Sequence, residues 1–108
     1  MPRIANRFHG PAQVSNAAAT KLTVAANEKA IIRHIHIQNP SGAAVTFTMS
    51  IGADAAGTRI FDAFVIAAGS VFDHFCYYIL EEAEIMQAFA GTNNILVLEI
   101  GGDRSVLG

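Results

Sequence analysis

Val45-Thr46-Phe47-Thr48-Met49-Ser50-Ile51 alternates apolar side chains with side chains that carry a hydroxyl group. Successive side chains of a β-strand point to opposite faces, so the apolar residues share one face and the hydroxyl groups the other. The stretch therefore predicts a strand that is buried on one side. No segment of the sequence shows the period of an amphipathic helix, and the chain as a whole predicts an all-β domain.

Further segments of strand length are separated by turn signals. Asn39-Pro40-Ser41-Gly42 is a strong turn because proline fixes φ and glycine accepts positive φ, and residues 91–94 suit a tight hairpin. Gly101-Gly102 is expected to end the last strand. This spacing indicates a sandwich or a small barrel, and we adopt a single antiparallel β-sandwich with jelly-roll or immunoglobulin-like strand order. The expected strands span residues 20–25, 30–38, 44–51, 58–66, 71–80, 84–90 and 95–100.

The chain of 108 residues has the length of one domain. Residues 20–101 are expected to form the β-sandwich, residues 102–108 a short C-terminal tail, and residues 1–19 an extended N-terminal arm. The arm is polar but carries Ile4 and Phe8. These two side chains are expected to dock either on a neighbouring subunit or on the edge of this domain's own core.

Charged residues make up only 15% of the sequence and hydrophobic residues 52%; an average protein has about 25% charged residues. A surface with few charges indicates that another protein covers part of it, although the many alanines offer an alternative explanation. The net charge is −2 and no cluster of lysine and arginine follows one face, which argues against nucleic-acid binding. No apolar run reaches the ~20 residues of a membrane span, so we expect neither nucleic acid nor membrane as a partner.

His34 and His36 are the strongest candidates for chemistry. Two residues apart on a strand, they point the same way and are close enough to share a metal ion. No aspartate or glutamate follows the pair closely, as a cupin-type site would require, which leaves His74 or its neighbour Asp73 from another strand. The alternative is an exposed or interface face that holds two histidines. The sequence thus predicts no complete metal site and no cofactor, and His34 and His36 are the candidate metal ligands.

Other polar residues give weaker signals. If Ile35 and Ile37 point inward, strict alternation places Arg33 inward as well, where it would extend out of the core or pair with a carboxylate. Asp62 and Asp73 form a candidate carboxylate pair, but a glycosidase would need both groups beside a groove. The alternative is that these aspartates are exposed or that one pairs with Arg33 or Arg59.

Cys76 is the single cysteine and cannot form an intrachain disulfide. Its aromatic neighbours indicate a buried thiol without an activating charge. With no nucleophile in an activating setting and no carboxylate pair beside a groove, we expect no catalytic residue and no enzymatic activity.

Aromatic side chains are expected on both faces of two neighbouring strands, with Phe61 opposed to Phe64 and Phe72 opposed to Phe75. One face belongs to the core, and the other leaves aromatic rings in water unless a neighbour covers it. A strand buried on both sides within the monomer is the alternative. We expect subunit packing, and the predicted interface residues are Ile4, Arg7, Phe8, Phe61 and Phe72.

A family resemblance lies in residues 34–54 and 66–70, which read HIHIQNPSGAAVTFTMSIGAD and IAAGS. They resemble small virion proteins of tailed bacteriophages, particularly those that infect actinobacteria. In that family an isoleucine-rich strand ends in an Asn-Pro or Asn-Thr turn, a second strand ends in Ile-Gly, and an Ala-Gly-Ser reversal leads to an apolar strand. The resemblance covers about residues 20–101, with a further match at 3–11. Ala83 stands where many members carry glycine.

The resemblance implies an accessory structural role in the virion, which is assembled in the host cytoplasm. Capsid decoration is the first interpretation: the protein would bridge capsomers and bind the assembled lattice, with the major capsid protein as partner. A symmetric homo-oligomer such as a trimer would suit that site. A tail, baseplate, neck or fibre-associated protein is the alternative. A second alternative is a small sugar- or metal-binding module that uses His34, His36 and the loop 52–57.

Overall fold

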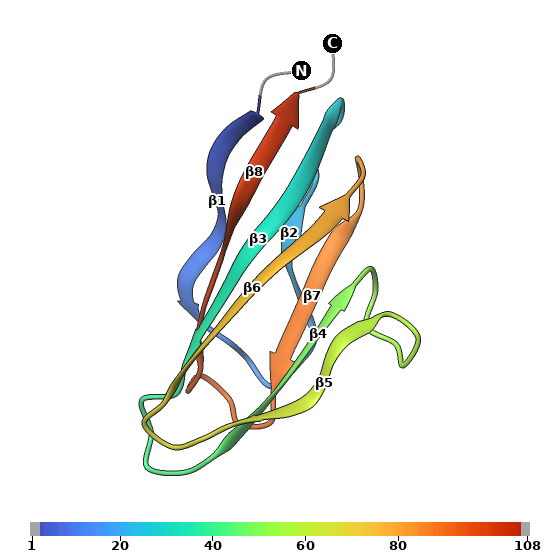
Figure 1. Ribbon diagram of the computed structural model, residues 1–108. Helices are drawn as coiled ribbons and strands as arrows, with labels where there is room; N and C mark the ends of the chain where they lie inside the picture. Colours follow the sequence, from blue (N-terminus) through green and yellow to red (C-terminus); the bar gives the residue numbers. More distant parts are fainter. Residues whose placement is uncertain (1–2, 107–108) are drawn as a thin grey trace.

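The computed structural model describes residues 3–106, which form eight β-strands and no helix (Figure 1). The predicted all-β class is confirmed. In the same part of the chain there is no helix that is long and apolar enough to cross a membrane. The strands are β1 (Arg3–Gln13), β2 (Ala19–Thr23), β3 (Glu28–Gln38), β4 (Val45–Ile51), β5 (Arg59–Ile66), β6 (Val71–Leu80), β7 (Ile85–Ala90) and β8 (Val97–Val106).

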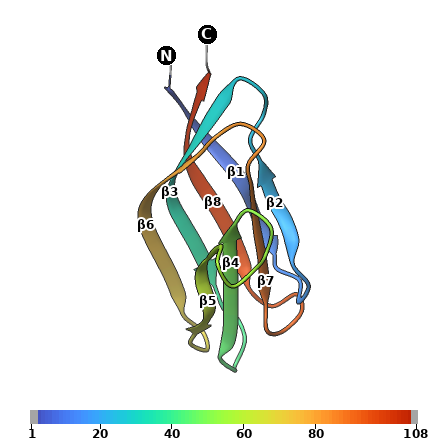
Figure 2. The same ribbon diagram turned by 90° about the vertical axis from the view of Figure 1, so that its right-hand side faces the viewer.

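The strands pair in reverse order along the chain. β1 pairs with β8, β2 with β7, β3 with β6 and β4 with β5, and every pairing is antiparallel. The first half of the chain therefore lies along the second half as a long ribbon, which folds over into two sheets (Figure 2). Sheet A has the order β1-β8-β3-β6 and sheet B the order β2-β7-β4-β5. This double-sheet, eight-stranded arrangement is a jelly roll, which decides between the two strand orders that the sequence left open.

The core lies between the inner faces of the two sheets. The strand that decided the fold from sequence, β4, is central in sheet B, and its apolar residues Val45, Phe47 and Met49 are buried as expected. Its hydroxyl-bearing face is covered as well, because Thr48 and Ser50 are also buried. Sheet A contributes the largest share of aliphatic side chains to the core, among them Ile32, Ile35, Ile37, Leu98 and Ile100.

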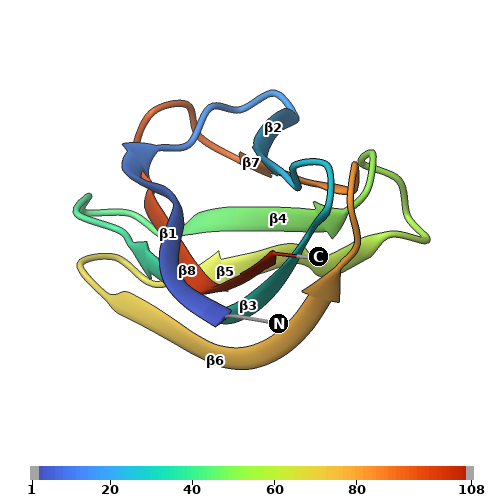
Figure 3. The same ribbon diagram turned by 90° about the horizontal axis from the view of Figure 1, so that it is seen from above.

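The segment expected as an N-terminal arm does not stand apart from the sandwich. Residues 3–13 form β1, which pairs along its length with β8 at one margin of the curved sheet A (Figure 3). Phe8 packs against the core, and Val14, just after the strand, is fully buried in it. Residues 1–2 lie outside the described part of the chain. The segment belongs to the fold because it pairs with one side of β8, whose other side pairs with β3.

The expected C-terminal tail is likewise largely strand. β8 continues through Gly101-Gly102 to Val106, and only residues 107–108 lie outside the described part. The two glycines do not break the strand, and Gly102 allows a close approach. A Cβ atom on Gly102 would lie 1.9 Å from the carbonyl oxygen of Ile31 on the neighbouring strand β3. This is the point where the register between β3 and β8 shifts, so that Arg33 is an extra residue, a β-bulge.

Phe47 tests the assignment of the core. Its side chain is fully buried, whereas the side chain of Phe75 on the outer face of sheet A is 77% exposed. We expect Phe47→Ala to lower the free energy of unfolding by about 3–5 kcal/mol because it leaves a cavity. The matched control Phe75→Ala should cost less than about 1 kcal/mol. Chemical denaturation of both variants measures the difference, and equal losses would contradict the facing of β4.

Ala83 tests the turn in which the family resemblance shows a departure. Its φ is 68°, in the left-handed region, and its N–H donates to the carbonyl of Val24 over 2.9 Å. This conformation costs an L-residue about 1–2 kcal/mol, and glycine does not carry that cost. Glycine also lowers stability by about 0.4–1 kcal/mol, because it raises the entropy of the unfolded chain. We therefore expect Ala83→Gly to raise the free energy of unfolding by about 0.5–1 kcal/mol.

The control for Ala83→Gly is Ala44→Gly, at an exposed loop position where φ is not positive. It should lower stability slightly, because only the entropic effect of glycine remains. Thermal and urea unfolding of both variants provide the comparison. A loss of stability in Ala83→Gly similar to that in Ala44→Gly would show that the turn is not in the left-handed conformation.

Candidate functional site

The outer face of sheet A carries the most distinctive chemistry of the molecule, and the bulge in β3 determines which side chains lie there. Before the bulge Ile32 points inward, and after it Ile35 and Ile37 point inward again; all three are fully buried. The two residues between them, Arg33 and His34, are therefore both displayed on the outer face. The prediction that Arg33 lies on the inward side is wrong, because strict alternation does not hold across the bulge.

An apolar stripe runs along the outer face of β6, which is a margin of sheet A. Val71, Phe75, Tyr77 and Ile79 are 52%, 77%, 57% and 54% exposed, and we call these four residues the β6 stripe. The alternate residues of the strand, such as Phe72 and Tyr78, pack against the core instead. Large apolar side chains that are this exposed and lie along one strand are typical of surfaces that bind another molecule.

Asp73 lies inside the β6 stripe and is bound by both histidines of β3. His34 Nε2 and His36 Nδ1 lie 2.8 Å and 2.6 Å from the same carboxylate oxygen, Oδ1. The register of the strands explains the contact, because His36 is the residue directly opposite Asp73. The hydrogen bonds from His36 and then His34 hold the pKa of the Asp73 carboxyl below its usual range.

The ring of His34 is held from a second direction. It stacks on Phe75 with ring centroids 4.6 Å apart and an angle of 6° between the planes. The rings of His34 and His36 meet edge to face at 6.0 Å. His34, His36 and Asp73, which we call the histidine cluster, thus come from two strands, and one of them is clamped by an aromatic residue of the β6 stripe.

Ion pairs cover the rest of this face. Asp103 of β8 accepts hydrogen bonds from Arg3 at 2.9 Å and from Arg33 at 3.3 Å. The guanidinium group of Arg33 also lies over the ring of Tyr77, 5.8 Å from its centroid. Arg7, a predicted interface residue, pairs with Glu99 at 3.3 Å on the exposed surface. Such exposed pairs contribute little to stability, about 0–1 kcal/mol each, but they leave a mixed and nearly neutral surface beside the stripe.

Two further predicted interface residues, Phe61 and Phe72, pack against the core of the sandwich. They form one aromatic cluster with Phe64, at centroid distances of 5.7 Å (Phe61–Phe64) and 4.7 Å (Phe64–Phe72). Phe61 and Phe64 do not lie on opposite faces as expected, because β5 bulges at Ala63, whose φ is 50°. Of the predicted interface residues, Ile4 and Arg7 remain exposed, and the exposed aromatic residues of β6 are Phe75 and Tyr77.

The two aspartates considered as a carboxylate pair lie on different sheets. Asp62 of β5 pairs with Arg59 at 3.0 Å, as the alternative interpretation held. Arg59 also donates to both carboxylate oxygens of Asp54, at 2.9 Å and 3.2 Å, and this contact lowers the pKa of Asp54. These groups form an ion-pair network on sheet B, whereas Asp73 belongs to the histidine cluster on sheet A.

The single thiol lies at the edge of the core. Cys76 is half-buried, and its Sγ lies 3.4 Å from the carbonyl oxygen of Ile32, to which it donates. Burial raises the pKa of the thiol, which keeps it protonated and unreactive at neutral pH. This agrees with the expectation of a thiol without an activating charge.

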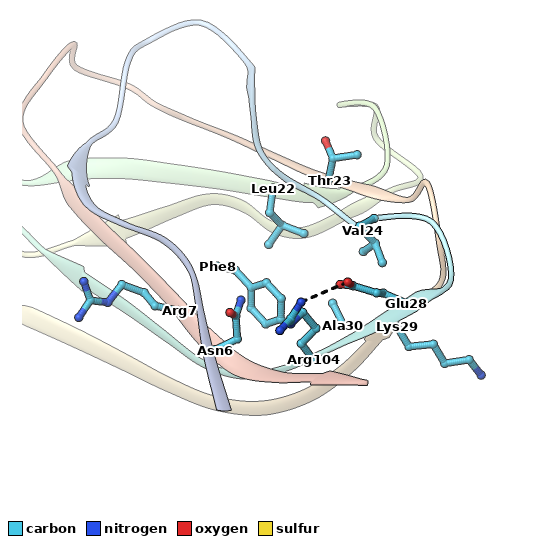
Figure 4. A pocket seen from close by; sticks show the side chains of 11 residues that line it. Asn6, Arg7, Phe8, Leu22, Thr23, Val24, Glu28, Lys29, Ala30 and Arg104 are labelled. Carbon is cyan, nitrogen blue, oxygen red and sulfur yellow. Dashed lines mark hydrogen bonds and ion pairs between the residues drawn. The ribbon is translucent and has the colours of Figure 1, made fainter. Parts of the chain in front are cut away.

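A cavity of about 240 Å³ opens between β1, β2 and the start of β3 (Figure 4). Phe8, Leu22 and Val24 give it an apolar lining, and an ion pair between Arg104 and Glu28, 3.2 Å apart, crosses one side. The side chains of Arg7 and Lys29 point away from it (Figure 4). Of the charged residues that line the cavity, Glu28 and Arg104 are paired with each other.

No protein-family model, no curated protein and no solved structure matches the chain. His34 and His36 were expected on one face, with His74 or its neighbour Asp73 as candidates from another strand, but the sequence did not show which of the two lies opposite the pair. The missing information was the register between β3 and β6. The alternation in residues 71–80 was visible in sequence, but not which of its two faces lies outside.

Proposed function

We propose that the protein is a structural protein of a bacteriophage virion and acts as a capsid decoration protein through protein–protein contacts. The observation that carries the proposal is the β6 stripe. Four large apolar side chains are exposed in a row along a margin of sheet A, next to a face whose charges are already paired. The resemblance of residues 34–54 to virion proteins of tailed bacteriophages is the reason for proposing a virion as the assembly that the protein joins.

The β6 stripe has the composition of a contact surface. Tyr77 and Phe75 are aromatic, and aromatic side chains are enriched at the buried centres of interfaces. Arg33, which lies over Tyr77, and Asp103 form a polar rim beside them. A partner that covers the stripe would remove apolar area from water without leaving an unpaired charge behind.

The margin of sheet A offers a second kind of contact. β6 is ten residues long and, within residues 3–106, pairs with β3 on one side only, so the backbone groups on its other side are available to a strand of another chain. Both a capsid subunit and a second copy of this chain would fit. The proposal includes a homo-oligomer, such as a trimer. The tail, baseplate, neck and fibre are the alternative locations.

The proposal is tested first by copy number. Quantitative mass spectrometry of purified phage particles should find the protein in a ratio to the major capsid protein within a few-fold of one. A handful of copies per particle would place it in the tail or neck. Its absence from particles would contradict the virion proposal in both forms.

The contact surface is tested by retention on particles. We expect the double variant Phe75→Ser and Tyr77→Ser to be lost from particles, because the stripe loses its aromatic area. The matched control is Val65→Ser, since Val65 is an apolar residue of sheet B with a similar exposure of 60%. It should be retained like the wild-type chain. Equal retention of all three proteins would show that the β6 stripe is not the contact surface.

A further inference from the structure

The histidine cluster carries an inference that is independent of the virion role. His34 Nε2, His36 Nδ1 and a carboxylate oxygen of Asp73 all lie within 4.8 Å of one another. Two imidazole nitrogens and one carboxylate are a donor set found at zinc sites with three protein ligands and an open fourth position. We propose that His34, His36 and Asp73 bind a divalent transition-metal ion, with Zn²⁺ as the best match.

The geometry is close to what the ion requires. Zinc binds imidazole nitrogen and carboxylate oxygen at about 2.0–2.2 Å, so the ligand atoms of a tetrahedral site lie about 3.3 Å apart. The two nitrogen–oxygen distances in the cluster are 2.8 Å and 2.6 Å. The nitrogen and oxygen atoms must therefore move apart by about 0.5–0.7 Å to admit the ion. The three side chains are partly exposed, so rotation of their outer torsions provides this change without movement of the strands.

The donor set also selects among metals. Calcium and magnesium prefer six or more oxygen ligands, and the cluster offers one carboxylate. Nitrogen-rich sites favour zinc, copper and nickel, and among these ions geometry rather than raw affinity decides. The cluster therefore suits Zn²⁺ and discriminates against Mg²⁺ and Ca²⁺.

Access and orientation support the site. A shallow hollow with His34, Glu99, Gly101 and Gly102 in its lining lies next to the cluster. It provides an entry path and room for the fourth ligand. On the other side the ring of Phe75 stacks on His34, which limits the orientations of that ligand. A pre-oriented ligand loses less conformational entropy when the ion binds.

Metal binding requires a defined change in the histidine rings. An ionised carboxylate only accepts hydrogen bonds, so in the metal-free cluster His34 Nε2 and His36 Nδ1 each carry the hydrogen that points at Asp73. The same two nitrogens must be free of hydrogen to bind the ion. A ring that carries a single hydrogen must therefore move it to its other nitrogen, and each hydrogen bond to Asp73 is exchanged for a bond to the metal.

The experiment is isothermal titration of the full chain with Zn²⁺, with Mg²⁺ as the comparison ion. We expect saturable binding of one Zn²⁺ per chain, no binding of Mg²⁺, and a rise in the melting temperature with Zn²⁺. The variants Asp73→Asn and His36→Gln should weaken Zn²⁺ binding at least about tenfold. The control Asp62→Asn removes an exposed aspartate outside the cluster and should bind like the wild-type chain.

A second measurement keeps the proposal testable if a variant fails to fold. Nitrogen-detected NMR of the histidine rings in the wild-type chain should show Zn²⁺-induced shifts at His34 Nε2 and His36 Nδ1, together with the tautomer change. His9 and His74 serve as internal controls and should not change. Absence of Zn²⁺ binding, undiminished binding in Asp73→Asn, or ring shifts confined to His9 or His74 would each overturn the proposal.

Discussion

The bulge in β3 is the constraint on which the outer surface of this jelly roll depends. The core requires Ile32, Ile35 and Ile37 on the inner face, and an uninterrupted strand cannot place positions 32 and 35 on the same side. The extra residue resolves the conflict by turning both Arg33 and His34 outward. It is accommodated because Gly102 of β8 has no Cβ atom, which would meet the carbonyl oxygen of Ile31.

The histidine cluster and the β6 stripe depend on each other. Asp73 lies in the middle of an apolar row, where a contact with another protein would remove its charge from water at a high cost. The two hydrogen bonds from His34 and His36 provide this carboxylate with partners within the chain. Phe75 in turn belongs to the stripe and stacks on His34. A metal ion in the cluster would occupy the same place in this surface and would replace hydrogen bonds with coordination bonds.

The sequence predicted the strands well where one face is buried, because alternation then leaves a clear pattern, as in residues 45–51. It failed for residues 3–13, since the register of β1 with β8 shifts twice and the bulges hide the period. It also misjudged Arg33 and the Phe61–Phe64 pair, each beside a bulge. The meeting of His36 with Asp73 depends on strand register, which composition and local pattern do not encode.

The most direct test of this account is a measurement of proton contacts across the bulge by NMR. The structure predicts nuclear Overhauser effects between the rings of His34 and Phe75, whose centroids are 4.6 Å apart, and between the Arg33 side chain and the Tyr77 ring. Both sets appear together only if the bulge places two consecutive residues of β3 on the outer face. Contacts from only one of the two residues to β6, with the other in the core, would show a regular strand and contradict the account.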